Sequence, residues 1–222
     1  MPVTPRAVIF DLDGTLLDTL EDIADAMNAV LFAHGLPEHP LTAYRRFVGS
    51  GLGQLVALAL GQAAKDRALL AQAVAQAEKE YGRRWADKTR PYAGVPEMLA
   101  ALSAQGLPLA ILSNKPDGFT KLSTNHYFTP SPFAHIFGEQ PGFPRKPAPD
   151  AALELARLMG VAPNEVAFLG DSDIDMKTAK SAGMLALGAA WGFRGEEELR
   201  AAGADRILTS PLDLFAVCAV QE

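Results

Sequence analysis

Four short apolar runs, each ending in a polar residue or a glycine, constrain the fold of this chain most strongly. The runs cover residues 7–10, 107–112, 166–169 and 184–187, with a weaker candidate at 206–208. Short apolar runs bounded by turn residues are typical of strands that are buried on both faces. Between them, apolar residues recur at helical spacing over 95–102 and 153–159. Strands that alternate with helices predict βαβ units, and therefore an α/β fold with a Rossmann-like parallel sheet.

The segment from residue 18 to residue 90 interrupts this alternation. It contains three helical patterns and no convincing strand, and the clearest pattern places Leu20, Ile23, Met27 and Val30 on one helix face. We therefore predict two domains. The core consists of residues 1–17 and 91–222, and an inserted helical domain consists of residues 18–90.

Composition and charge exclude several classes of partner and location. The net charge of −6 argues against nucleic acid or an anionic membrane as a partner held by bulk electrostatics. The single cysteine, Cys218, cannot form an internal disulfide. No apolar run approaches the ~18 residues of a membrane span, and the four apolar residues before Asp11 are too few for a signal peptide. We expect a cytoplasmic protein that is a monomer or a homodimer.

A first candidate site follows the first predicted strand, in the sequence Asp11-Leu12-Asp13-Gly14-Thr15. Ligands of parallel sheets bind at the carboxyl ends of the strands. Because side chains alternate along a strand, Asp11 and Asp13 can face the same way there. Two carboxylates that lie close together repel each other unless a cation joins them. An ordinary turn or helix cap, where Asp, Gly and Thr are common, would also explain the pattern.

A second acidic group, Asp171 to Asp175, follows the strand predicted at 166–169. Asp171 and Asp175 are four residues apart, so we expect them to share one face of the helix that begins there. Acidic capping of that helix is the alternative interpretation. Oxygen ligands from two strand ends, without His or Cys nearby, suit Mg²⁺.

Two further groups stand at the remaining strand ends. Ser113 and Asn114 offer a hydroxyl and an amide to a phosphoryl oxygen, although a simple turn would also explain them. Lys146 precedes a segment with two prolines, whose stiff backbone could fix its charge, although most lysines are merely solvated. Together with the carboxylates, these side chains make up the inventory for phosphoryl transfer.

The four groups resemble, in order and spacing, the motifs of the haloacid dehalogenase superfamily, over essentially the whole chain. The resemblance is carried by Asp11 to Thr15, Ser113-Asn114, Lys146 and Gly170 to Asp175. It implies that Asp11 attacks phosphorus and forms an aspartyl-phosphate. It implies that Asp13 protonates the leaving group and then activates water. The dehalogenating branch lacks an acid/base aspartate at the second position, so Asp13 favours phosphate chemistry.

The same resemblance implies the binding residues. The phosphoryl oxygens would be held by Ser113 and Lys146, with Gly14, Thr15 and Asn114 beside them. Mg²⁺ would be bound by Asp11, the Asp13 carbonyl and Asp171, and Asp175 would be a supporting acid near the metal or Lys146.

The inserted helices resemble the cap of a branch that contains phosphoglycolate phosphatases, β-phosphoglucomutases and phosphonoacetaldehyde hydrolases. Within it, the motifs look most like those of bacterial phosphoglycolate phosphatases, which implies a small phosphorylated metabolite as substrate and favours 2-phosphoglycolate. Pyrophosphate, a nucleotide or a sugar phosphate stays open as the substrate, and so does a phosphomutase reaction. A non-catalytic binding module is disfavoured by the intact motifs.

Candidate substrate contacts in the insertion are Arg45 and the glycine loop with Gly49, Ser50 and Gly51. Backbone N–H groups of a glycine loop and a guanidinium can both bind a carboxylate. The alternative is that Arg45 and its neighbour Arg46 form an exposed helix face.

Overall fold

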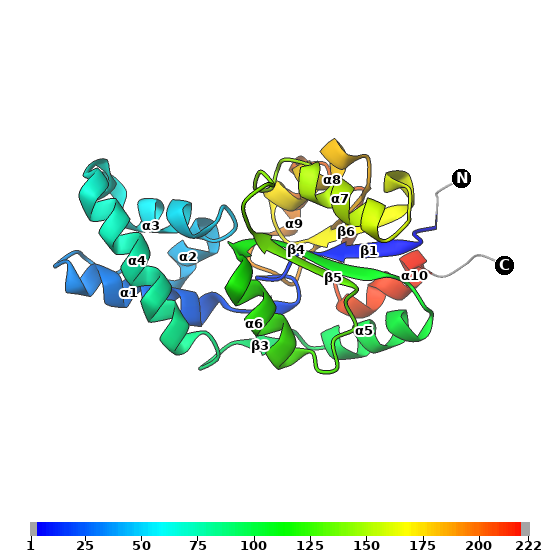
Figure 1. Cartoon of the computed structure of the whole chain (residues 1–222), viewed down its shortest axis with the longest axis horizontal. Coiled ribbons are helices and arrows are strands. Elements are labelled where there is room, and N and C mark those ends of the chain that lie inside the picture. Colours follow the sequence, from blue (N-terminus) through cyan, green and yellow to red (C-terminus); the bar gives the residue numbers. More distant parts are fainter. Residues whose placement is uncertain (1–3, 219–222) are drawn as a thin grey trace.

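The computed structural model describes residues 4–218, and a six-stranded parallel sheet forms its centre (Figure 1). Its strand order is β5-β4-β1-β6-β7-β8. The strands are β1 (Ala7–Phe10), β4 (Leu109–Pro116), β5 (His135–Glu139), β6 (Val166–Gly170), β7 (Leu185–Ala189) and β8 (Arg206–Leu208). The first strand lies centrally, between β4 and β6. The chain therefore extends the sheet in both directions from β1, and the carboxyl end of β1 is the switch point where ligands of such sheets bind.

Helices cover both faces of the sheet, which explains why the central strands β1 and β6 are buried at every position and carry no polar side chain. Val8 and Phe10 of β1 pack into one hydrophobic cluster, and Ala7 and Ile9 pack into another on the opposite face. The first cluster includes residues of α5 (Val95–Ala104) and α10 (Leu214–Cys218). The second includes residues of α7 (Asp150–Leu158), α8 (Asp173–Ala182) and α9 (Glu196–Ala201). Helix α6 (Asp117–Tyr127) lies against β4 and β5.

The predicted α/β fold is confirmed, with differences at individual strands. The strand predicted at 107–112 is β4, which begins at Leu109 and continues through the polar residues to Pro116. The register between β4 and β5 shifts after Leu112, so this polar end departs from regular pairing. Strand β5 was not predicted, because it is a partly exposed edge strand with few apolar residues.

The inserted segment folds into four α-helices and a short 3-10 helix (Gly61–Lys65), and the α-helices have a hydrophobic core of their own. They are α1 (Leu20–Ala33), α2 (Leu41–Phe47), α3 (Leu52–Leu60) and α4 (Arg67–Arg84). Met27, Tyr44 and Val56 are fully buried in this core. Helix α2 is additional to the three predicted patterns. Two short antiparallel strands, β2 (Leu17–Asp18) and β3 (Arg90–Pro91), connect the helices to the sheet.

Contacts between the two parts hold the inserted helices over the carboxyl ends of the sheet strands. The side-chain amide of Asn114, in β4, donates a hydrogen bond to the Gly49 carbonyl at 2.9 Å. Arg194 donates to the carbonyls of Arg46 and Val48, both at 3.2 Å. The loop between α2 and α3 therefore lies directly above the switch point of the sheet.

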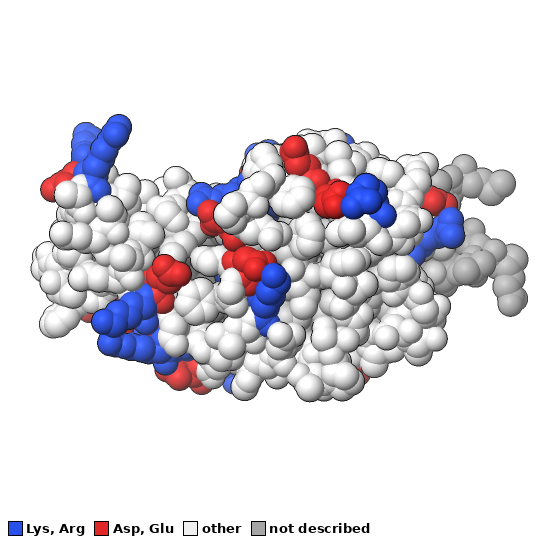
Figure 2. All heavy atoms as spheres, viewed as in Figure 1, with Lys and Arg blue, Asp and Glu red and all other residues white. Residues whose placement is uncertain are grey.

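Charges of both signs are mixed on the face of the molecule that Figure 2 shows. On the face shown in Figure 2, the Lys and Arg side chains of the described residues lie among Asp and Glu and form no continuous basic stripe. Within residues 4–218, no helix combines the length and the apolar character that crossing a membrane requires.

Candidate active site

Three buried carboxylates meet at the carboxyl ends of β1 and β6. Asp11 follows β1, Asp171 follows β6, and Asp175 lies in the first turn of α8. Each offers one oxygen atom, and these three atoms lie within 4.8 Å of one another. The two acidic groups predicted at separate strand ends are therefore brought together.

The prediction that Asp171 and Asp175 share one face of a helix is wrong. Helix α8 begins at Asp173 and Ser172 is its N-cap, so Asp171 stands before the helix. Asp175 accepts a hydrogen bond from the Ser172 N–H at 3.1 Å, and Ser172 Oγ accepts one from the Asp175 N–H at 3.4 Å. This capping box turns the Asp175 carboxylate back toward the end of β6, and so brings it close to Asp171.

Lys146 is the cation of this cluster. Its Nζ lies 2.9 Å from Asp11 Oδ1 and 2.7 Å from Asp175 Oδ1, and the side chain is almost completely buried. Burial alone would lower the pKa of Lys146, but the carboxylates of Asp11 and Asp175 raise it above its ordinary value. The ammonium is therefore permanently charged at neutral pH. The predicted proximity of Asp175 to Lys146 is seen directly.

One ammonium does not balance three carboxylates. Burial raises the pKa of Asp11 to about 7, although Lys146 opposes the shift, and the Asp175 charge adds to it. Burial, and then the charges of Asp175 and Asp11, also raise the pKa of Asp171 well above its usual range. Asp11 Oδ1 is buried and accepts no well-directed hydrogen bond from the described residues. A buried set of hard oxygen atoms with excess negative charge fits a divalent cation.

Two close backbone approaches fix the position of Asp171. Gly14 has a φ of +89°, and a Cβ at this position would stand 2.3 Å from Asp171 Oδ2. A Cβ at Gly192 would stand 2.3 Å from Asp171 Cβ. The Asp171 carboxylate accepts hydrogen bonds from the Thr15 hydroxyl at 3.2 Å and the Phe193 N–H at 2.8 Å. Thr15 thus contacts a carboxylate here, and its predicted contact with phosphate stays a prediction.

Asp13 lines the pocket next to Asp11 and forms a second, partly buried ion pair. Lys115 Nζ lies 2.8 Å and 3.1 Å from the two carboxylate oxygens of Asp13. It also lies 4.4 Å from the centre of the Tyr81 ring. The sequence contains no local signal for this pair. Lys115 and Asp13 are 102 residues apart, and Tyr81 comes from the inserted helix α4.

Ser113 and Asn114 have different surroundings in spite of being neighbours. Ser113 lines the pocket described below. The Asn114 amide donates to the Gly49 and Lys146 carbonyls, and its oxygen accepts from the Lys146 N–H at 2.9 Å. All polar atoms of the Asn114 side chain therefore bind protein groups, so this residue holds the Lys146 backbone. Its phosphate contact stays a prediction.

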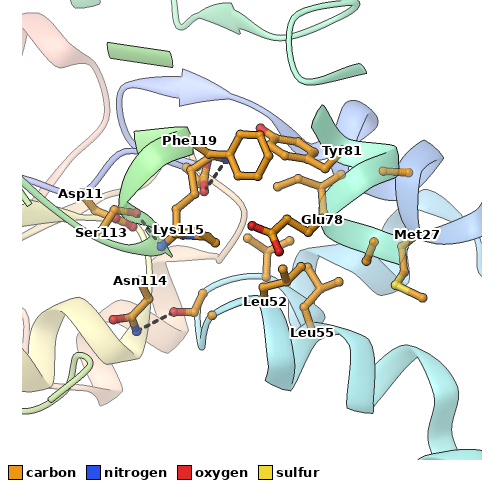
Figure 3. Close-up of a pocket in the computed structure, with 18 residues that line it drawn as sticks. Asp11, Met27, Leu52, Leu55, Glu78, Tyr81, Ser113, Asn114, Lys115 and Phe119 are labelled. Carbon is orange, nitrogen blue, oxygen red and sulfur yellow. Dashed lines mark hydrogen bonds and ion pairs between the residues drawn. The ribbon is translucent and has the colours of Figure 1, made fainter. Parts of the chain in front are cut away.

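A pocket separates the carboxyl ends of the strands from the inserted helices (Figure 3). Its polar floor includes Asp11, Asp13, Ser113, Asn114 and Lys115. Its other wall is mainly apolar and includes Met27, Leu52, Leu55, Tyr81 and Phe119. Of the predicted cap residues, Gly49 and Gly51 line the pocket, whereas Arg45 and Ser50 do not. Arg45 is exposed on α2, as the alternative interpretation expected.

Comparison with known proteins assigns this arrangement to a family. A family model of haloacid dehalogenase-like hydrolases matches residues 8–189. A phosphoglycolate phosphatase of Pseudomonas putida is 34% identical, over 97% of this chain and 80% of its own length. One from Thiobacillus denitrificans is 36% identical over 82% of each chain. The crystal structure of a predicted phosphoglycolate phosphatase from Haemophilus somnus is 28% identical with a TM-score of 0.89, over 97% of this chain and 98% of its own.

The chain belongs to the haloacid dehalogenase-like hydrolases. Within that family it is a phosphatase.

Proposed function

We propose that this phosphatase hydrolyses 2-phosphoglycolate to glycolate and phosphate. The observation that carries the proposal is the position of the Asp11 carboxylate. It lies at the floor of the pocket, 2.9 Å from the buried Lys146 ammonium, with Asp13 beside it. The substrate is favoured by the curated relatives, which are phosphoglycolate phosphatases that match this chain over 80% and 82% of their own length.

In the proposed reaction, Asp11 is the nucleophile and Asp13 is the acid and base. An Asp11 oxygen forms a bond to phosphorus while the bond from phosphorus to the ester oxygen breaks. Asp13 gives its proton to that oxygen, and glycolate leaves. Asp13 then accepts a proton from a water molecule that attacks phosphorus, so phosphate leaves and Asp11 is regenerated.

The remaining residues of the site would hold the charges in place. Mg²⁺ would be held by the Asp11 carboxylate, the Asp13 carbonyl and the Asp171 carboxylate. When bound, it neutralises negative charge that would otherwise repel a phosphate dianion from Asp11. Lys146 and the Ser113 hydroxyl would contact the phosphoryl oxygens, and Asp175 would keep Lys146 in position. The contact of Lys146 with both carboxylates supports this role.

We also propose residues 18–90 as a cap that excludes bulk water, over a core of residues 1–17 and 91–222. The hydrogen bond from Asn114 to Gly49 and those from Arg194 to the end of α2 would hold the cap closed. A closed cap favours transfer to Asp11 over uncontrolled hydrolysis. A cytoplasmic location and a monomeric or dimeric state stay predictions.

The test is phosphate release from a panel of phosphate esters, with Mg²⁺ and with a chelator. The panel contains 2-phosphoglycolate, pyrophosphate, a nucleotide, a sugar phosphate and ethyl phosphate. The proposal predicts the highest kcat/KM with 2-phosphoglycolate, and loss of that activity with chelator. A higher kcat/KM with another member of the panel would contradict the substrate, and Mg²⁺-independent turnover would contradict the metal.

A further inference from the structure

Lys115 has no role in the reaction above, yet it is the only cation among the described residues that line the pocket. The other charged lining residues are Asp11, Asp13 and Glu78, all acids. We propose that Lys115 binds the carboxylate of the substrate and so selects esters with an acidic leaving group. This proposal rests on the proposed function, because it places the phosphoryl group at Asp11 and the leaving group at Asp13.

The position of Lys115 matches the place where that carboxylate would lie. Its Nζ is 2.8 Å from Asp13 Oδ1, and Asp13 is the group that reaches the ester oxygen. In 2-phosphoglycolate a single methylene separates the ester oxygen from the carboxylate carbon, a span of two bonds of about 1.5 Å each. A carboxylate beside the ester oxygen therefore lies within reach of the same ammonium that contacts Asp13.

The hydrogen-bonding capacity around Lys115 is incompletely used. An ammonium has three donors, and two of them point to the two Asp13 oxygens. The Tyr81 hydroxyl is also buried and has no hydrogen-bond partner among the described residues. The ring of Tyr81 packs against the Lys115 ammonium. The Tyr81 O–H donor and the charge of Lys115 therefore face the same end of the pocket, which suits a second anionic group.

The surroundings make Lys115 more selective than an exposed lysine. The side chain is only 4% exposed, so water screens its charge weakly. The wall opposite is apolar at Met27, Leu52 and Leu55, and Glu78 adds a carboxylate to the same pocket (Figure 3). An anionic group would find attraction at Lys115 and repulsion near Glu78. Arg45, the other candidate for this role, is exposed and lies outside the lining.

The experiment uses two non-hydrolysable phosphonates that differ only at the end of the chain, where one carries a carboxylate and the other a methyl group. In the presence of Mg²⁺, 3-phosphonopropionate mimics 2-phosphoglycolate, and propylphosphonate replaces its carboxylate with a methyl group. A charge-assisted hydrogen bond predicts that the wild-type protein binds 3-phosphonopropionate about 10- to 100-fold more tightly, as measured by calorimetry. In Lys115→Met this ratio falls to about one, and in Lys115→Arg most of it is retained because the charge remains.

The matched control is Lys121→Met, which removes an exposed lysine of α6 paired with Asp117. This variant keeps the wild-type ratio. An equal ratio in Lys115→Met and Lys121→Met overturns the proposal, and so does a wild-type ratio near one.

Lys115→Met leaves the Asp13 carboxylate without its partner, which destabilises the folded protein. A second pair of variants tests the proposal without this effect. Asp13→Asn and the double variant Asp13→Asn/Lys115→Met contain no unpaired buried carboxylate at this position. The proposal predicts a preference for 3-phosphonopropionate in the single variant and none in the double variant. A preference in both overturns it.

Phosphate release from 2-phosphoglycolate by the wild-type protein tests the proposed function separately. Turnover of that substrate, combined with a preference that survives loss of Lys115, overturns the role of Lys115 alone. Lack of turnover contradicts the proposed function whatever the phosphonates show.

Discussion

Replacing Asp175 with asparagine tests the physical basis of the site, because it removes a charge and keeps the shape. In the wild-type protein, Lys146 Nζ lies 2.7 Å from Asp175 and 2.9 Å from Asp11, and no part of the Asp175 side chain is exposed. The asparagine side chain could still accept one hydrogen bond, but it could not serve Lys146 and Ser172 as a carboxylate does. The buried ammonium would then have a single counter-charge.

The expected magnitude follows from two opposing effects. Removing one partner of a buried ion pair costs about 3–5 kcal/mol of the free energy of unfolding. Part of that cost is offset, because the Asp175 charge raises the pKa of both Asp11 and Asp171, and this repulsion disappears. With Asp11 still in contact with Lys146, we expect a net loss of about 2 kcal/mol. For a chain of this size that lowers Tm by about 4–8 °C.

The assay is thermal and urea-induced unfolding in metal-free buffer, at pH 8, for Asp175→Asn and a matched control. The control is Asp173→Asn, which changes a partly exposed carboxylate paired with Lys177 in the same helix. Such a pair contributes less than about 1 kcal/mol. If the two variants unfold at the same temperature and urea concentration, the Asp175 charge does not stabilise the site as described.

Three other outcomes follow from the structure. The pKa of Asp11 in the folded protein is about 7, against an ordinary 3.8, so the metal-free protein gains stability as the pH falls through that range. Mg²⁺ should therefore raise Tm more at pH 8 than at pH 5.5. An equal rise at both pH values would contradict the proposed metal site. Asp22→Ala should lower the free energy of unfolding by about 3 kcal/mol, measured by urea denaturation. The buried Asp22 carboxylate accepts hydrogen bonds from the N–H groups of Lys88 and Thr89 and from the Thr89 hydroxyl. A loss under about 1 kcal/mol would contradict the importance of these hydrogen bonds. Arg45→Ala should change kcat/KM for 2-phosphoglycolate by less than about twofold, since the Arg45 side chain is exposed outside the pocket. A rise of about tenfold in KM would show that Arg45 contributes to substrate binding.

Much of the core could be predicted because its signals are local. Strand β1 is buried on both faces, so its four residues are all apolar and stand out against the polar residues that follow. Strands of a parallel sheet end at a common edge, which brings Asp11 and Asp171 together whatever the details of the loops. The carboxylate cluster therefore follows from the order of strands and motifs.

The parts that were missed either lack an apolar signal or depend on the contacts of a single side chain. Strand β5 lies at the edge of the sheet, where exposure removes the apolar signal. The start of α8 is set by the Ser172 side chain, so a spacing of four residues did not place Asp171 on that helix. Lys115 is buried only because Asp13 and Tyr81 surround it, and nothing near residue 115 in the sequence indicates this.

In the proposed reaction, Asp11 carries the phosphoryl group during turnover. The most direct measurement is an acid quench of the protein during steady-state hydrolysis of 2-phosphoglycolate, followed by mass spectrometry of its peptides. We expect one added phosphoryl group on the peptide that contains Asp11, and none in Asp11→Asn treated in the same way. A phosphoryl group on another residue, or rapid turnover in Asp11→Asn, would show that Asp11 is not the nucleophile.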